Sequence, residues 1–117
     1  MILETDKRKH PRTRCEVDSS YKNLDLPAAL MPSETVVQDI SEGGIRFRSS
    51  HFVPIKNKLL FKIQIPKRKC IEAVAQPAWI REVPSVNQYD VGAKFLSLSE
   101  EDREIIRQFT SSLSVAQ

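Results

Sequence analysis

"KLLFKIQIP" (Lys58–Pro66) alternates apolar and polar side chains along most of its length. One face of an extended chain would carry the apolar side chains of Leu59, Phe61, Ile63 and Ile65. The other face would carry Leu60 and the polar side chains of Lys62 and Gln64. Because successive side chains of a β-strand point to opposite faces, this stretch predicts a strand with one buried and one wet side.

The same kind of signal recurs from Arg14 to Leu98 as short β-branched and aromatic stretches between polar or proline-containing breaks. Further strands are predicted at "ETVVQDI" (Glu34–Ile40), "GIRFRS" (Gly44–Ser49), "CIEAVAQPAWIREV" (Cys70–Val83) and "QYDVGAKFLSL" (Gln88–Leu98). Pro77 predicts a bulge or an edge position, since proline donates no ladder hydrogen bond. "PKRK" (Pro66–Lys69) and "PSVN" (Pro84–Asn87) are typical of turns between strands. The main part of the chain is therefore all-β.

Only the C-terminus has a helical pattern. Ser99 and Asp102 resemble a capping box, and acidic residues fill the first turn, where the helix dipole favours negative charge. Apolar residues then recur at helical spacing, at Ile105, Ile106, Phe109 and Leu113. We expect a helix over about 99–113 that closes one end of a small β-barrel or half-open sheet.

Composition and charge narrow the class of protein. The chain has 117 residues, of which 40% are hydrophobic and 28% charged, as in an ordinary globular domain. It contains neither a run of about 18 apolar residues nor a signal peptide, so we expect a cytoplasmic protein without membrane insertion. The net charge is only +3, yet residues 7–14 alone hold five Lys or Arg. This local positive charge favours one anionic partner at one place.

The sequence offers no catalytic or metal-binding pattern. His10 and His51 have no second ligand at metal spacing, and Cys15 and Cys70 are far apart, which predicts buried free thiols. Nucleophilic-serine and nucleoside triphosphate motifs are absent. We therefore expect a binding protein, with no catalytic residues, metal or cofactor.

Two short patterns are the candidates for binding. In "RKHPR", Arg8 and Arg12 present planar donor forks suited to a phosphate or to the O6/N7 edge of guanine, and Pro11 favours an extended arm. In "DISEGG", Asp39 and Ser41 could bond local backbone or a ligand. The glycines of this motif, Gly43 and Gly44, allow positive φ and close backbone approach.

Together, the RxxxR arm, the DxSxxG junction and the ending "VGAKFLSLSEEDREIIRQF" (Val91–Phe109) resemble the PilZ domain family of bacterial cyclic di-GMP receptors. The resemblance implies a six-stranded antiparallel β-barrel with a C-terminal helix. It divides the chain into a flexible basic arm, residues 1–13, and a barrel with its helix, residues 14–117. The ligand contacts it implies are Arg8, Arg12, Asp39, Ser41 and Gly44. Further candidates are Lys7, which precedes the first Arg and bears on whether one or two ligands bind, and Arg14, Gly43 and Arg46.

The resemblance also implies a mechanism: cyclic di-GMP orders the arm and thereby signals to a separate partner protein. Two alternatives remain. One is a ligand-independent PilZ-like module that binds only proteins. The other is a nucleic-acid-binding β-barrel, which we disfavour because no aromatic platform is evident: Phe47 and Phe61 are assigned to the core, and Trp79 lies beside a proline in a hydrophobic strand.

Overall fold

The computed structural model describes residues 13–26 and 32–115, which form six strands, one 3-10 helix and one α-helix. The strands are β1 (Thr13–Asn23), β2 (Ser33–Ile40), β3 (Gly44–Ser49), β4 (Leu59–Gln64), β5 (Cys70–Val83) and β6 (Gln88–Ser97). The 3-10 helix η1 (Pro84–Val86) joins β5 to β6, and the α-helix α1 (Glu100–Val115) follows β6.

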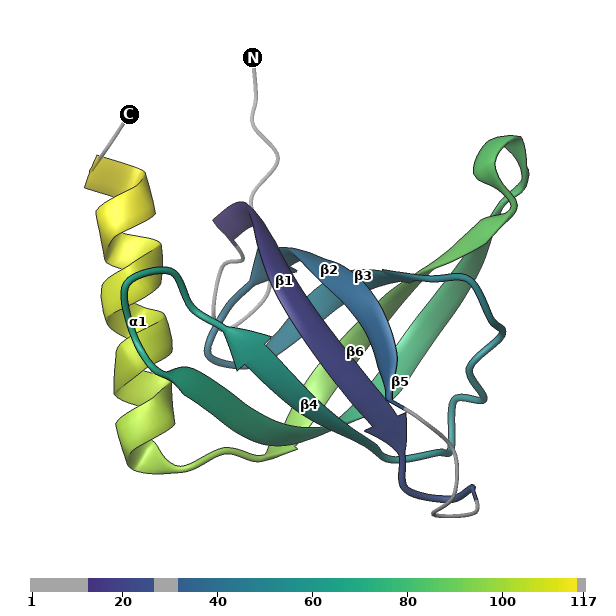
Figure 1. Ribbon diagram of the computed structural model, residues 1–117, viewed down its shortest axis with the longest axis horizontal. Helices are drawn as coiled ribbons and strands as arrows, with labels where there is room; N and C mark the ends of the chain where they lie inside the picture. Colours follow the sequence, from purple (N-terminus) through teal and green to yellow (C-terminus); the bar gives the residue numbers. More distant parts are fainter. Residues whose placement is uncertain (1–12, 27–31, 116–117) are drawn as a thin grey trace.

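The strands close into a barrel in the order β1-β2-β3-β6-β5-β4, and every neighbouring pair is antiparallel. Helix α1 lies at one end of the barrel, and the β5–β6 hairpin extends away at the other (Figure 1). The predicted six-stranded antiparallel barrel with a C-terminal helix is therefore confirmed.

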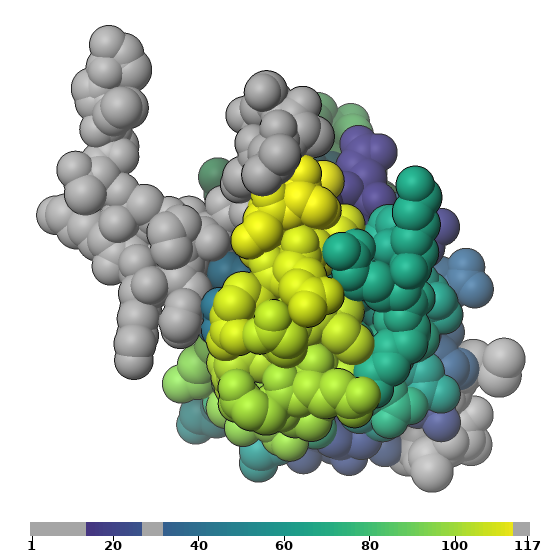
Figure 2. All heavy atoms as spheres, turned by 90° about the vertical axis from the view of Figure 1, so that its left-hand side faces the viewer, coloured from purple at the N-terminus to yellow at the C-terminus, as the bar shows by residue number. Residues whose placement is uncertain are grey.

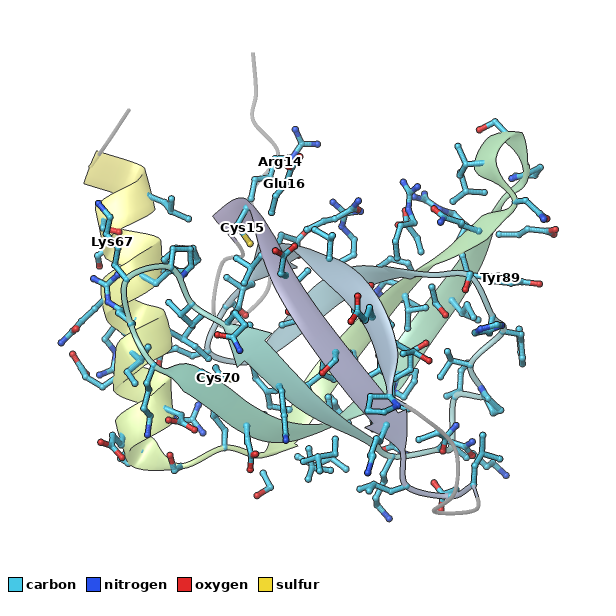
Figure 3. The ribbon with its side chains drawn as sticks, viewed as in Figure 1. Arg14, Cys15, Glu16, Lys67, Cys70 and Tyr89 are labelled. Carbon is cyan, nitrogen blue, oxygen red and sulfur yellow. The ribbon has the colours of Figure 1, made fainter. Side chains whose placement is uncertain are left out.

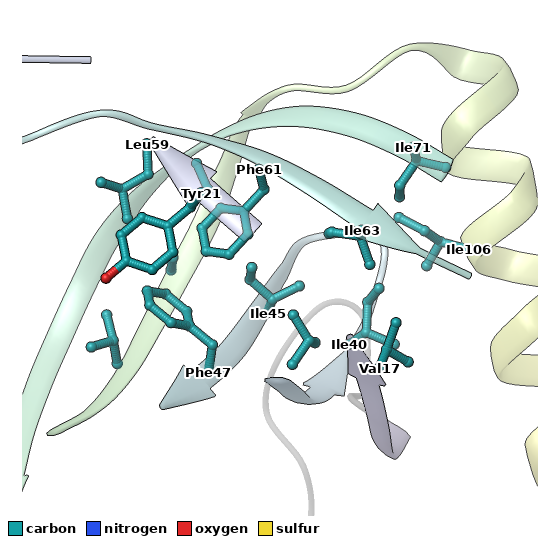
Figure 4. Packing of buried hydrophobic residues seen from close by; sticks show 14 of the residues in the cluster. Val17, Tyr21, Ile40, Ile45, Phe47, Leu59, Phe61, Ile63, Ile71 and Ile106 are labelled. Carbon is teal, nitrogen blue, oxygen red and sulfur yellow. The ribbon is translucent and has the colours of Figure 1, made fainter. Parts of the chain in front are cut away.

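Alternate side chains of the strands fill the barrel. Leu59, Phe61 and Ile63 of β4 are completely buried, as the alternating pattern predicts. Phe61 meets Tyr21 and Phe47 at ring-centroid distances of 5.2 and 4.9 Å (Figure 4). Full burial of one such side chain stabilises the fold by about 1.5–3 kcal/mol. These three aromatic rings, from β1, β3 and β4, hold together strands that are distant in sequence.

Strand β5 changes its pairing at its proline. It pairs with β4 only from Cys70 to Ala75, whereas its pairing with β6 continues to Val83. The register with β6 shifts between Pro77 and Trp79. Pro77 is buried and Trp79 is exposed, although residues two apart in a regular strand share a face. The bulge predicted at Pro77 is thus confirmed.

Helix α1 begins as its sequence indicates. The hydroxyl oxygen of Ser99 accepts a hydrogen bond from the N–H of Asp102 at 3.0 Å, which caps the first turn. The Asp102 carboxylate does not complete a capping box. It accepts a hydrogen bond from the N–H of Glu72 at 3.4 Å and lies 3.1 Å from the Lys69 Nζ. On the face of α1 that is turned away from solvent, Ile106 and Phe109 are buried against the barrel.

The two predicted tight turns are present. Lys67 in the β4–β5 hairpin and Asn87 after η1 adopt φ values of 62° and 55°, the left-handed region that tight turns use. The β4–β5 hairpin lies beside α1 (Figure 2), where Lys69 contacts the Glu101 carboxylate at 3.2 Å. The exposed cations at this hairpin tip, Lys67 and Arg68, lie between β4 and β5, and neither strand pairs with β2 or β3.

Within residues 13–26 and 32–115, no helix is long and apolar enough to cross a membrane. In the same ranges, His, Cys, Asp and Glu side chains nowhere gather in threes as metal ligands would. Cys15 and Cys70 are free thiols, and each is half-buried rather than fully buried.

Candidate functional site

The turn between β2 and β3 is closed by its own serine. The N–H of Ser41 donates to the Gly44 carbonyl at 2.9 Å. The Ser41 hydroxyl oxygen accepts hydrogen bonds from the N–H groups of Gly43 and Gly44 at 3.1 and 3.2 Å. Only 4% of Ser41 is exposed. Its hydroxyl therefore fixes the shape of the turn, as serine does in such motifs.

Gly44 is required by space and not by its backbone conformation. We expected Gly43 and Gly44 to allow positive φ, but none of the glycines has one. Instead, a Cβ atom on Gly44 would lie 2.2 Å from the carbonyl oxygen of Ala93 on β6. The N–H of Phe95 also donates to the Gly43 carbonyl at 2.9 Å. Gly44 therefore lets β6 approach the turn closely, which is the second of the two roles predicted for the glycines.

Asp39 lies at the end of β2, directly before the turn. Its Cα partners are Arg14 on β1 and Arg46 on β3. Arg46 Nε donates to Asp39 Oδ2 at 2.7 Å, and Arg46 Nη1 donates to Gln38 Oε1 at 2.8 Å. The motif carboxylate is therefore held in place by a neighbouring guanidinium on the outer surface of the barrel.

Strand β1 begins beside this turn. Thr13 is opposite Ile40 and Arg14 is opposite Asp39 in the β1–β2 pairing. Figure 3 shows Arg14 at the start of β1. The basic segment that precedes Thr13 in the sequence thus joins the barrel next to the DxSxxG turn. The predicted ligand contacts that lie outside the described residues are those of Lys7, Arg8 and Arg12.

Three arginines meet at one buried carboxylate of β6. Asp90 accepts hydrogen bonds from Arg46 Nη1 at 3.3 Å, Arg48 Nε at 2.8 Å and Arg81 Nη2 at 2.7 Å. Its side chain is only 3% exposed. Burial alone would raise the pKa of Asp90, but the hydrogen bonds from Arg48 and Arg81 outweigh it and lower the pKa below its ordinary value. Asp90 therefore stays ionised at neutral pH.

The strand register explains this meeting. Asp90 on β6 is the Cα partner of Arg48 on β3 and of Arg81 on β5. Arg46 is opposite Gly92, two residues further along β6 and on the same face. Directly opposed residues of antiparallel strands have their side chains close together. The sequence separates these residues widely, and the barrel brings them together.

An open hollow of about 660 Å³ lies over these residues. The side chains around it come from β1, β2, β3, β5 and β6, and they include four arginines and two carboxylates. The arginines are Arg14, Arg46, Arg48 and Arg81, and the carboxylates are Glu16 and Asp90. The surface next to the DxSxxG turn is therefore hollow and positively charged, as an anion-binding site requires.

Trp79 is a candidate residue that the sequence analysis missed. It is 36% exposed, and its Cα partner is Gly92. A Cβ atom on Gly92 would lie 2.2 Å from the Trp79 Nε1, so the indole packs directly over this glycine. Phe47 and Phe61 lie in the core as expected, whereas Trp79 presents an exposed aromatic face that the sequence analysis did not predict. The combination of Pro77 before Trp79 with a glycine on the next strand is the signal that could have indicated it.

Cys15 also borders the hollow, but its thiol is not reactive. It donates a weak hydrogen bond to the Val37 carbonyl at 3.6 Å. Burial, with a contribution from the negative charge of Asp39, raises the pKa of Cys15 to about 12. Because the thiolate is the nucleophile, Cys15 remains a protonated, inert thiol at neutral pH.

Helix α1 contacts the same turn through Glu42. Arg107 Nε and Nη2 donate to the two carboxylate oxygens of Glu42 at 3.0 and 2.9 Å. Arg103 Nη1 donates to the Glu42 carbonyl at 3.2 Å. Because Glu42 lies between Ser41 and Gly43, the DxSxxG turn is joined directly to the C-terminal helix.

Comparison with known proteins identifies a family. The model of the PilZ domain matches residues 6–112, which is most of the chain. No curated protein matches the sequence. The matched range includes residues 6–13 of the basic arm and most of the C-terminal helix, up to residue 112.

Solved structures share the fold at low sequence identity. The Bacillus subtilis inhibitor of motility MotI/DgrA is 17% identical with a TM-score of 0.81, and the match covers 97% of this chain and 54% of that one. The PilZ domain of YcgR from Escherichia coli, solved with c-di-GMP, is 16% identical with a TM-score of 0.71, covering 95% and 94%. The Borreliella burgdorferi PlzA protein in complex with c-di-GMP is 14% identical with a TM-score of 0.62, covering 90% and 41%. The chain thus spans about half the length of MotI and nearly all of the YcgR domain.

Proposed function

Because the chain belongs to the PilZ domain family, we propose that it is a receptor for cyclic di-GMP. PilZ domains are binding modules, and two of the similar structures contain this dinucleotide. The proposed binding surface runs from the start of β1 across the β2–β3 turn to the arginine-lined hollow.

One observation supports the proposal: the β1–β2 register puts the start of β1, which the basic arm precedes in the sequence, beside the DxSxxG turn. Arg14 is paired with Asp39, and Arg12 precedes Arg14 by two residues in the chain. Arg8 is four residues earlier than Arg12 in the sequence, and we propose that both arginines reach the turn. Two motifs that are separated in sequence can therefore act on a single ligand.

The residues have complementary chemistry for this ligand. We assign phosphate oxygens and a guanine edge to the guanidinium forks of Arg8 and Arg12. Asp39 would accept hydrogen bonds from the guanine N1–H and N2–H groups, while Ser41 and Gly44 hold the turn at which the base lies. Trp79 gives a base an exposed aromatic face. The further candidates are Lys7, Arg14, Gly43 and Arg46, and we assign Lys7 to the choice between one and two ligands.

Ligand binding could be transmitted to a partner protein through the arm and α1. A ligand gripped by the arm and the turn would order the arm against the barrel, which is an order–disorder switch. The turn also contacts α1 through Glu42 and Arg107. We therefore place the altered surface, and the docking of a separate downstream protein, at the arm and the adjoining face of α1.

Isothermal titration calorimetry with cyclic di-GMP tests the proposal. Separate titrations with GTP and cyclic di-AMP measure the specificity of binding. The decisive variant is Arg8→Ala, Arg12→Ala. Lys67→Ala, Arg68→Ala is the matched control, because it removes two cations at the exposed β4–β5 hairpin tip. Each charge-assisted hydrogen bond contributes about 1.5–3 kcal/mol, so the arm variant should lose at least about 100-fold in affinity. The control should bind as the wild type does.

The outcomes separate the three candidate functions. Selective micromolar binding that the arm variant loses supports the receptor. Absence of heat and of any melting shift at saturating ligand would leave the ligand-independent protein-binding module. Equal, steeply salt-dependent binding of any single-stranded oligonucleotide would instead support the nucleic-acid-binding barrel, which the exposed Trp79 makes worth testing.

A further inference from the structure

The cluster around Asp90 has the geometry of an anion-binding platform. Three guanidiniums from β3 and β5 converge on a carboxylate that is 3% exposed, on the outer face of the barrel. Like charges at this spacing repel one another, so the arrangement depends on the carboxylate between them. Its hydrogen bonds of 2.7 and 2.8 Å to Arg81 and Arg48 fix the orientation of both side chains.

The arginines keep donors for a ligand. Arg81 uses only Nη2 for its hydrogen bond to Asp90, and its side chain is 70% exposed. Its other two nitrogens have no acceptor among the described residues. Arg48 donates through Nε to Asp90 and, at a long 3.5 Å, through Nη1 to Gln88. Both guanidiniums border the hollow, so their remaining N–H groups are available to an anion there.

The cluster is continuous with the DxSxxG motif. Arg46 joins the Asp39 and Asp90 carboxylates, at 2.7 and 3.3 Å. A ligand held at Asp39 therefore lies next to the arginine cluster. Because cyclic di-GMP has two phosphodiester groups, an arm that grips one of them leaves the other to be neutralised elsewhere.

We infer that Arg48 and Arg81, with Arg46 as the link to the motif, bind one phosphodiester of the ligand, and that buried Asp90 is their positioning residue. This inference rests on the proposed function. It extends the site from the arm and the turn across β3, β6 and β5, and it assigns a role to residues outside both motifs.

For the Asp90→Asn variant, two explanations of the cluster predict opposite changes in the affinity for cyclic di-GMP. If the cluster acts only through its charge, removal of one negative charge should strengthen binding of an anionic ligand. If Asp90 positions the arginines, the affinity for cyclic di-GMP should fall by about tenfold despite the added net positive charge. Isothermal titration of the folded variant, verified by circular dichroism, measures the difference.

Arg81→Gln is the second variant, since its largely exposed side chain can be changed without loss of the fold. It should weaken binding about tenfold and lower the slope of log affinity against log salt by about one. Arg68→Gln, with the same charge change at the exposed β4–β5 hairpin tip, is the matched control and should change affinity less than about twofold.

The results distinguish this inference from the proposed function. If the wild type does not bind cyclic di-GMP, the proposed function fails. If the wild type binds, but Asp90→Asn and Arg81→Gln both bind like Arg68→Gln, only the platform is refuted. Weaker binding of Arg81→Gln with an unchanged salt slope would overturn the phosphodiester assignment, because it would indicate a contact with a base.

Discussion

Replacement of Gly44 by alanine should destabilise the barrel at the point where the turn meets β6. The new Cβ atom would lie 2.2 Å from the carbonyl oxygen of Ala93 and 3.1 Å from the Cα of Lys94. Both neighbours are backbone atoms of β6, so no side chain can rotate to make room. Relief requires β3 and β6 to move apart, which strains the pairing of Gly44 with Lys94.

The Gly44→Ala substitution should lower the free energy of unfolding. Insertion of a methyl group into a close-packed site typically costs about 1–3 kcal/mol. Since backbone limits the relaxation here, we expect about 3 kcal/mol for Gly44→Ala, or roughly 10–15 °C in melting temperature for a domain of this size. Urea unfolding followed by far-ultraviolet circular dichroism gives the free energy of unfolding.

Gly43→Ala is the matched control. Gly43 is adjacent in sequence, is exposed and has no positive φ, so its replacement should change the free energy of unfolding by no more than about 0.5 kcal/mol. If Gly44→Ala unfolds at the same urea concentration as this control, the close approach of β6 is not the reason that glycine is required at position 44.

Three further predictions concern Trp79, Asp90 and Cys15. Trp79→Ala should lower the affinity for cyclic di-GMP about tenfold, because stacking contributes about 1–3 kcal/mol per base, and ligand should change the fluorescence of this single tryptophan in the wild type; an unchanged affinity would remove Trp79 from the site. The pKa of Asp90 is lowered in the folded state, so its stabilisation is complete above the unfolded-state pKa of about 4 and is lost as pH falls through the folded-state value. The difference in unfolding free energy between wild type and Asp90→Asn should accordingly be constant from pH 6 to 8 and shrink below about pH 4; a constant difference down to pH 2 would contradict the ionic role. Cys15, whose pKa is raised to about 12, should resist iodoacetamide at pH 8 in the native protein and react in urea, as peptide mass spectrometry can show; rapid native labelling would contradict its burial.

The sequence was sufficient for the parts of the fold that depend on local patterns. Alternation at Leu59, Phe61 and Ile63 predicted which face of β4 is buried. Ser99 marked the start of α1, because an N-cap acts on the three residues that follow it. Such signals are contained within a few residues, so no knowledge of the tertiary arrangement is needed to interpret them.

The arginine platform could not be predicted in this way. Asp90 contacts Arg48 and Arg81 because β6 pairs with β3 and β5. The registers of these pairs cannot be deduced from the sequence of any single strand. The bulge after Pro77 also turns the Trp79 side chain outward. The sequence analysis had placed Trp79 in a hydrophobic strand and did not predict this exposure. Residues that depend on long-range register were therefore the ones missed.

The central claim is that cyclic di-GMP binds on the outer surface beside the β2–β3 turn. Amide chemical-shift mapping of the nitrogen-15-labelled protein during titration with cyclic di-GMP tests it most directly. The account predicts large shifts at Gly43, Gly44, Arg46 and Asp90, and small ones at Lys62 on β4, which is not adjacent to β2 or β3 in the barrel. Shifts that centre on β4, or none at saturating ligand, would contradict it.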